Sequence, residues 1–165
     1  MARGVIRGDC GRGGFVDAAS NPTYPMLNAL LHLNYLAVFV TAVGGFLIGW
    51  LWYSPVLFAK TWMVEMKITP ESMKEKDFNM GKLFGTSFAV TLLSTIGLAV
   101  LIAAHQSAGA LKGAELGAWV GVVIVGSRLI NGGLWEQRSL KLNAINVGHE
   151  VALFAVQGAI LGVWR

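Results

Sequence analysis

The chain has 165 residues, of which 55% are hydrophobic and 13% are charged. Charged residues make up about 25% of an average soluble domain, so this composition argues against a soluble protein and indicates an integral membrane protein. The net charge of +4 does not indicate nucleic-acid binding, because the basic residues flank apolar segments and form no patch interleaved with aromatic residues.

The first segment, 1–25, is polar and rich in glycine and arginine. It contains no apolar run long enough for the core of a signal peptide, so we interpret it as a polar tail. Cys10 lies in this tail and is the only cysteine, which excludes an intramolecular disulfide and a cysteine metal cluster. We expect residues 26–165 to form a single domain.

Four later segments are apolar and long enough to cross a membrane: 33–53, 83–104, 116–135 and 142–164. A helix rises about 1.5 Å per residue, so about 20 residues cross a hydrocarbon core of about 30 Å. The first two segments contain no charged residue, the third contains Arg128, and the fourth contains His149 and Glu150. We therefore predict an all-α fold, an integral membrane bundle of four transmembrane helices in the lipid bilayer.

The loop after the first span is expected to begin with a short helix that lies at the membrane–water interface. Pro55 ends the span behind a group of aromatic residues, which favour the membrane–water interface. Residues 56–67 then combine apolar side chains with Lys60 and Glu65, a pattern typical of a short interfacial helix.

Basic residues near the spans are more numerous on the side that holds the loop 54–82 and the turn after the third span. Such an excess favours the cytoplasmic side. We therefore expect both termini to lie outside the cytoplasm, and we expect the membrane to be a bacterial inner membrane.

Polar residues inside the third and fourth spans are expected to meet. At 100° per residue, Arg128 and Asn131 share a face with Gly117 and Gly121, and the polar residues of the fourth span occupy an arc of about 120°. The short connecting turn makes the two helices antiparallel and places Arg128 and Glu150 at a similar depth, about 12–14 Å from it. An isolated charge at the bilayer centre costs at least about 2.5 kcal/mol, so we expect these two residues to form an ion pair. The predicted intramembrane polar cluster comprises Arg128, Asn131, Asn146, His149, Glu150 and Gln157.

Three roles for this cluster remain open from the sequence. It could be a structural ion pair that fixes which helices meet, or a route for protons or ions through His149 and Glu150. As a third alternative, His149 could bind a haem or another pigment through one ring nitrogen. His32 and His105 are expected at the opposite membrane face, which argues against a site with two histidines.

Motifs of common enzymes are missing from the sequence. It contains no HExxH, no GxSxG, no phosphate-binding GxxxxGK[ST] and no pair of carboxylates on one face of a span. We therefore name no catalytic residue and no metal ligand, and we expect a protein that is not an enzyme.

Several short pieces resemble a known family. They are Leu33-Asn34-Tyr35-Leu36-Ala37, Leu51-Trp52-Tyr53-Ser54-Pro55, the segment 58–63, the turn 135–142 and Ile145-Asn146-Val147-Gly148-His149. Together they resemble the small membrane proteins catalogued as domain of unknown function 1761, over about residues 33–165. The resemblance implies a four-helix membrane protein without an assigned activity, in which Asn34, Trp52, Tyr53, Ser54 and Pro55 belong to the first helix and its end.

Two functions follow from these observations. The first is a structural or accessory subunit that assembles with copies of itself or with other membrane protein subunits. The alternative is a small oligomeric transporter or channel that uses Arg128, Glu150 and His149.

Overall fold

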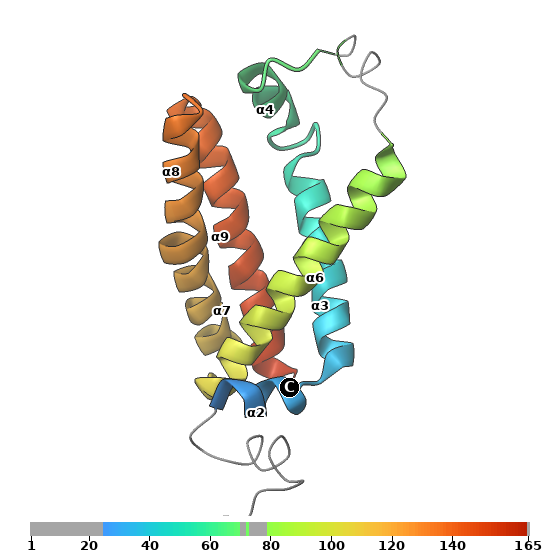
Figure 1. Ribbon diagram of the computed structural model, residues 1–165, viewed down its shortest axis with the longest axis vertical. Helices are drawn as coiled ribbons and strands as arrows, with labels where there is room; N and C mark the ends of the chain where they lie inside the picture. The colour runs from blue at the N-terminus through green and yellow to red at the C-terminus, as the bar shows by residue number, and fades with distance from the viewer. Residues whose placement is uncertain (1–24, 70–71, 73–78, 165) are drawn as a thin grey trace, which may run out of the picture.

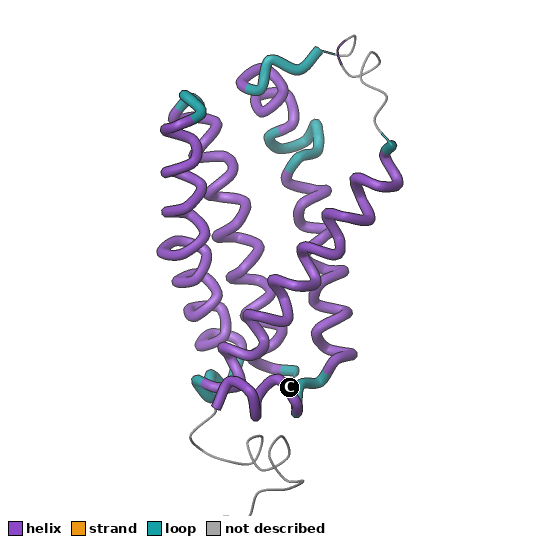
Figure 2. The backbone as a smooth tube through the Cα atoms, viewed as in Figure 1, coloured by secondary structure: helices purple, strands orange, loops and turns teal. Residues whose placement is uncertain are grey.

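The computed structural model describes residues 25–69, 72 and 79–164. These residues form helices and connecting turns, without a strand in the described ranges (Figure 2). In chain order the helices are α2 (Pro25–Leu31), α3 (Tyr35–Trp52), α4 (Ala59–Glu65), α6 (Met80–Ala104), α7 (Ala110–Trp119), η1 (Val120–Gly126), α8 (Ser127–Trp135) and α9 (Leu140–Val163).

Four helices are long and apolar enough to cross a membrane: Tyr35–Trp52, Met80–Ala104, Ala110–Trp135 and Leu140–Val163. This confirms the predicted all-α fold with four spans. The third span consists of α7, η1 and α8 without a break, and it begins at Ala110 rather than at residue 116. The predicted short helix after the first span is present as α4.

The two ends of the bundle differ in what they contain. Figure 1 shows α2 and the C-terminal end of α9 at one end, which we call the terminal end. The other end, which we call the loop end, contains α4 and the turn between α8 and α9. Residues 1–24 of the predicted tail lie outside the described residues. Helix α2 was not predicted, and it packs against α6 at the terminal end.

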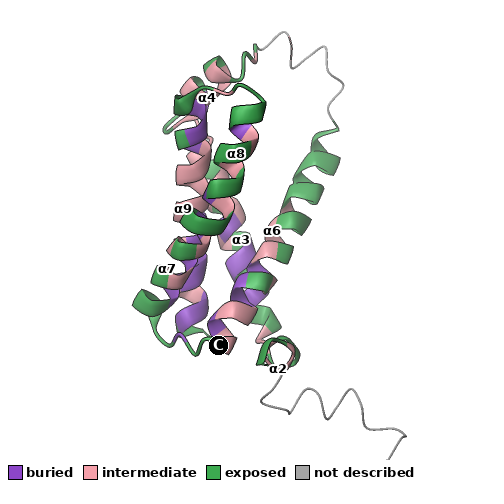
Figure 3. Ribbon diagram, turned by 60° about the vertical axis from the view of Figure 1, so that its left-hand side comes forward, coloured by how far each residue is buried: buried purple, intermediate pink, exposed green. Residues whose placement is uncertain are grey.

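The hydrophobic core joins α3, α6 and α9. Its buried members are Val38, Leu98, Ala99, Ile102, Phe154 and Leu161. By contrast, residues 80–87 at the start of α6 are all exposed. Figures 1 and 3 show this half of α6 leaning away from the other helices. The bundle is therefore packed at the terminal end and open beside α6 at the loop end.

The third and fourth spans pack through glycine. A Cβ atom added to Gly113 or Gly117 would collide with backbone atoms of α9, and one added to Gly121 would lie 2.9 Å from Val151 Cα. The Gly109 amide donates a hydrogen bond to the Gly162 carbonyl at 2.8 Å. Lipid supplies no hydrophobic force between helices, so close backbone packing of this kind is what holds them together.

The third span contains a π-helical segment, η1, in which backbone hydrogen bonds reach five residues back and one extra residue enters the turn. The spacing of the buried glycines along the third span matches this extra residue. Gly113, Gly117 and Gly121 are four residues apart, whereas the next buried glycine, Gly126, follows after five. The π segment therefore keeps a glycine face turned towards α9 on both sides of the extra residue.

Candidate functional site

The end of α3 is attached to α9 by two aromatic side chains. The Trp52 indole Nε1 donates a hydrogen bond to the Ile145 carbonyl at 3.2 Å, and the Tyr53 hydroxyl donates one to Asn146 Oδ1, also at 3.2 Å. The backbone turns sharply here, because the amides of residues 57 and 59 both donate to the Ser54 carbonyl. Both aromatic side chains therefore face protein, not the membrane interface.

His149 lies beside these two rings. Its ring centroid is 5.1 Å from that of Tyr53 and 6.0 Å from that of Trp52. His149 Nδ1 is 3.1 Å from Glu150 Oε1. The other nitrogen, Nε2, faces Gly49, where an added Cβ would lie only 3.3 Å away. Glycine at position 49 therefore admits the imidazole ring.

A hydrogen bond joins His149 Nδ1 to Glu150 Oε1, and the tautomer of the imidazole decides which of the two atoms donates. Nε2 is buried and has no hydrogen-bond partner among the described residues. The side chains of His149 and Glu150 are 12% and 26% exposed, respectively. The pair therefore places two hydrogen-bonded titratable side chains inside the fourth span.

Tyr53 remains a hydrogen-bond donor at physiological pH. Burial raises the pKa of Tyr53 to about 12, and the negative charge of Glu150 raises it in the same direction. We call Trp52, Tyr53, Asn146, His149 and Glu150 the loop-end cluster.

Gln157 lies deeper in the bundle and joins α9 to α6. Its Nε2 donates a hydrogen bond to Thr95 Oγ1 at 2.9 Å, and Thr95 Oγ1 donates to the Thr91 carbonyl at 2.7 Å. Gln157, Thr95 and Thr41 are all 0% exposed. Gln157 Oε1 and Thr41 Oγ1 have no hydrogen-bond partner in the described part of the chain. The amide of Gln157 packs over Gly45, where a side chain would collide with it.

Arg128 and Asn131 lie elsewhere, exposed on the outer face of α8. The expected ion pair between Arg128 and Glu150 is not formed, since the ion-pair partner of Glu150 in the described residues is His149. The prediction assumed 100° per residue throughout the third span. The extra residue in η1 breaks that assumption, because Arg128 follows the α9-facing Gly126 by two residues and so points about 200° away from it.

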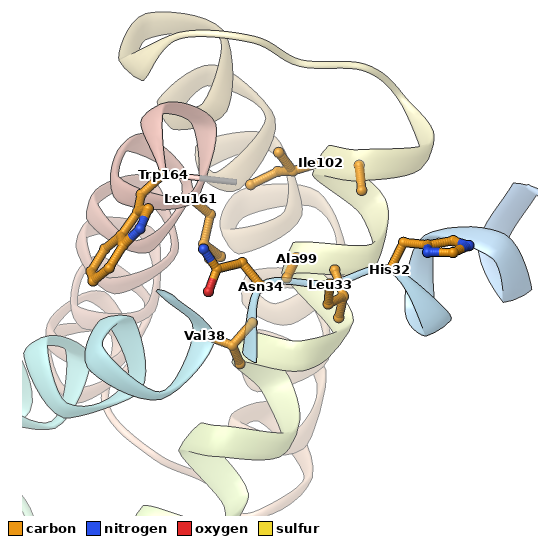
Figure 4. Close-up of a pocket in the computed structure, with 9 residues that line it drawn as sticks. His32, Leu33, Asn34, Val38, Ala99, Ile102, Leu161 and Trp164 are labelled. Atoms are coloured by element: carbon orange, nitrogen blue, oxygen red, sulfur yellow. The ribbon is translucent and has the colours of Figure 1, made fainter. Parts of the chain in front are cut away.

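A groove of about 430 Å³ lies between α3, α6 and α9. It is lined by Gly45, Phe46, Gly49, Trp50, Tyr53, Phe84, Ser87, Thr91, His149 and Leu153. A second cavity, of about 230 Å³, lies at the terminal end between Val38, Ile102, Leu161 and their neighbours. Figure 4 shows Asn34 and Trp164 beside this second cavity and the His32 ring turned away from them. Of these two cavities, only the groove is lined by residues of the loop-end cluster, namely Tyr53 and His149.

His149 Nε2, the nitrogen that would bind a pigment or haem, is buried and lies against Gly49. The described residues contain no group of three or more His, Cys, Asp or Glu side chains that could hold a metal ion.

The residues of the family-like motif have different environments. Asn34 accepts a hydrogen bond from the Ala37 amide at 3.1 Å and caps α3. Ser54 Oγ is buried, and Pro55 is exposed at the helix end. Trp52 and Tyr53 bind α9, which sequence reasoning missed because aromatic residues at the end of a span equally suit the membrane interface.

Comparisons with curated proteins and with solved structures found no match. Residues 36–162 match the family described as protein of unknown function, DUF1761. The matched range contains the whole loop-end cluster and all four spans except Tyr35 at the start of the first and Val163 at the end of the fourth. The chain therefore belongs to the DUF1761 family.

Proposed function

We propose that this membrane protein is a non-enzymatic subunit of a larger assembly, and that it binds a partner through the outer face of α8. The observation that carries the proposal is the exposure of Arg128 within the third span. A charged side chain near the centre of a transmembrane helix costs about 2.5–3.5 kcal/mol, so such residues usually face protein.

The outer face of α8 offers more than one polar group. Ser127 and Asn131 are exposed beside Arg128, and Trp135 is 84% exposed at the end of the same helix. Arg128 lies about 12 Å from the loop end, eight residues before Glu136. None of the described carboxylates lies within ion-pair distance of Arg128. A partner helix would supply the missing acceptors.

Charge also indicates the kind of partner. Two copies related by an axis normal to the membrane would place their Arg128 residues at the same depth and facing each other. Like charges brought together at an interface cost several kcal/mol. The outer face of α8 therefore suits a different subunit that carries a carboxylate at this depth.

The test is native mass spectrometry of the protein extracted gently from its own membrane. We expect a complex containing a second membrane protein, which is lost in Arg128→Leu. The matched control is Lys112→Leu, which removes an exposed cation from the terminal end of the same span and should retain the complex. An unchanged complex in Arg128→Leu, or the absence of a second protein from the extracted complex, would contradict the proposal.

A second candidate function, a small oligomeric transporter or channel, is supported by a different observation. The His149–Glu150 pair lies inside the fourth span, and Asn146 and Gln157 are also on the part of α9 that faces α3 and α6. Arg128 takes no part in such a route. Proton flux into liposomes that is lost in Glu150→Gln and kept in Glu115→Gln would support transport, and equal flux in both variants would refute it.

A further inference from the structure

The groove between α3, α6 and α9 has a defined depth. Chain direction places Tyr53 and Phe84 near the loop end and Gly45, Thr91 and Leu153 furthest from it. Thr91 follows the first residue of α6 by eleven positions, which corresponds to about 16 Å along the helix axis. The hydrocarbon core is about 30 Å thick, so the groove is about one leaflet deep.

The body of the groove is apolar. Phe46, Phe84 and Leu153 line it, and the two glycines of α3 leave room beside them. Polar side chains are few: Tyr53 and His149 towards the loop end, and Ser87 and Thr91 across the groove on α6. A volume of about 430 Å³ is within the range of about 300–1,000 Å³ that is usual for small-molecule sites.

The wall formed by α6 has no protein cover. Phe84 is 50% exposed, and all residues from 80 to 87 are exposed in the monomer. Because this wall belongs to a membrane span, the groove opens sideways towards lipid. Its occupant must therefore be soluble in the bilayer.

Among the described residues of the loop end, exposed basic side chains outnumber acidic ones. Helix α4 and the start of α6 lie at this end (Figure 1). Lys60 is exposed in α4, Lys67 is exposed just after it, and Lys82 is exposed in the first turn of α6. The two described acidic residues of this end, Glu65 and Glu136, each lie within 4.0 Å of another basic side chain, Lys141 and Arg138 respectively. Exposed lysines beside a membrane attract anionic lipid headgroups, with a contribution of about 1 kcal/mol each.

We propose that the groove is a binding site for one anionic phospholipid of the loop-end leaflet. One acyl chain lies along Phe46, Phe84 and Leu153, and the headgroup lies among the lysines of the loop end. The proposal rests on the groove and on these charges, and it is independent of any partner at Arg128.

The experiment is native mass spectrometry of the full chain in detergent, titrated with phosphatidylglycerol or with phosphatidylcholine. We expect one phosphatidylglycerol to bind more tightly than phosphatidylcholine. Ser87→Trp fills the groove from its exposed wall and should weaken phosphatidylglycerol binding by about tenfold. Lys60→Ala and Lys82→Ala should each weaken it by about fivefold, with little effect on phosphatidylcholine.

The matched control is Leu93→Trp, which places the same bulk on the opposite face of α6, where Leu93 is 70% exposed and does not line the groove. This variant should bind phosphatidylglycerol as the unmodified protein does. Equal binding by Ser87→Trp and Leu93→Trp would overturn the groove as the site. Equal binding of the two lipids would overturn the role of the lysines.

Discussion

Replacing Gly117 by alanine tests the close packing of the third and fourth spans. An added Cβ would lie 2.7 Å from the Phe154 carbonyl carbon and 3.3 Å from Ala155 Cα. The Phe154 carbonyl oxygen would lie closer still, and ordinary contact begins at 3.4 Å, so α7 and α9 must separate by more than about 1 Å. The obstructing atoms belong to backbone and cannot rotate away, as a flexible side chain could.

The cost of this substitution can be bounded. Overpacking usually costs about 1–3 kcal/mol, whereas alanine in place of glycine favours the helix by about 0.5–1 kcal/mol. We expect Gly117→Ala to lower the free energy of unfolding by about 1–2 kcal/mol.

The control is Gly132→Ala in the same span, because no atom lies within 4 Å of an added Cβ at that position. This variant should be stabilised by about 0.5–1 kcal/mol through helix propensity alone. Thermal unfolding of both variants, followed by circular dichroism in one detergent, gives the comparison. If Gly117→Ala is as stable as Gly132→Ala, the backbone contact is not important for stability.

One substitution tests the loop-end cluster, and a pair of deletions tests the π segment. Tyr53→Phe removes the hydrogen bond to Asn146 and should lower the free energy of unfolding by about 1 kcal/mol at neutral pH. The folded-state pKa of Tyr53, about 12, lies above the unfolded value of 10.0, so its contribution is complete below pH 10 and decreases as pH rises towards 12. The free energy of unfolding should therefore fall less steeply between pH 10 and pH 12 in Tyr53→Phe than in the unmodified protein. The same pH dependence in both proteins would refute the raised pKa of Tyr53. Deleting Val123 removes the extra residue of η1 but keeps the buried glycines on one face, so thermal stability should change by less than about 1 kcal/mol. Deleting Leu129 instead turns Gly133 by about 100° away from Asn143 and should be strongly destabilising, and equal stability of the two deletions would refute this account.

Most of the fold could be predicted because membrane spans have a simple physical signature. About 20 apolar residues are needed to cross the bilayer, and the segments near 33–53, 83–104, 116–135 and 142–164 satisfied this condition. The mixture of apolar and charged residues after Pro55 indicated a short helix, which is α4. Helix α2 has only seven residues and is followed closely by a span, so composition gave no separate signal for it.

The candidate site was harder to predict. An argument from periodicity assumes a constant rotation per residue, and η1 changes that rotation just before Arg128. Apolar residues face both lipid and protein in a membrane helix, so the sequence did not distinguish Trp52 at an interface from Trp52 bound to Ile145. Gln157 was predicted as a member of the intramembrane polar cluster, but its partner Thr95 was not among the predicted residues.

The hydrogen bond between Gln157 and Thr95 has a mechanical consequence. On its terminal side α6 is held by the core, whereas on its loop side residues 80–87 are exposed. Thr95 lies between these two parts. The part of α6 from Met80 to Thr95 is about 22 Å long, and it contacts α3 through Phe88 and Phe84, whose rings pack edge-on against Phe39 and Phe46. A tilt of about 10° at Thr95 would carry Met80 through about 4 Å. The hydrogen bond at Thr95 and the phenylalanine contacts with α3 together therefore limit how far the groove can widen at its mouth.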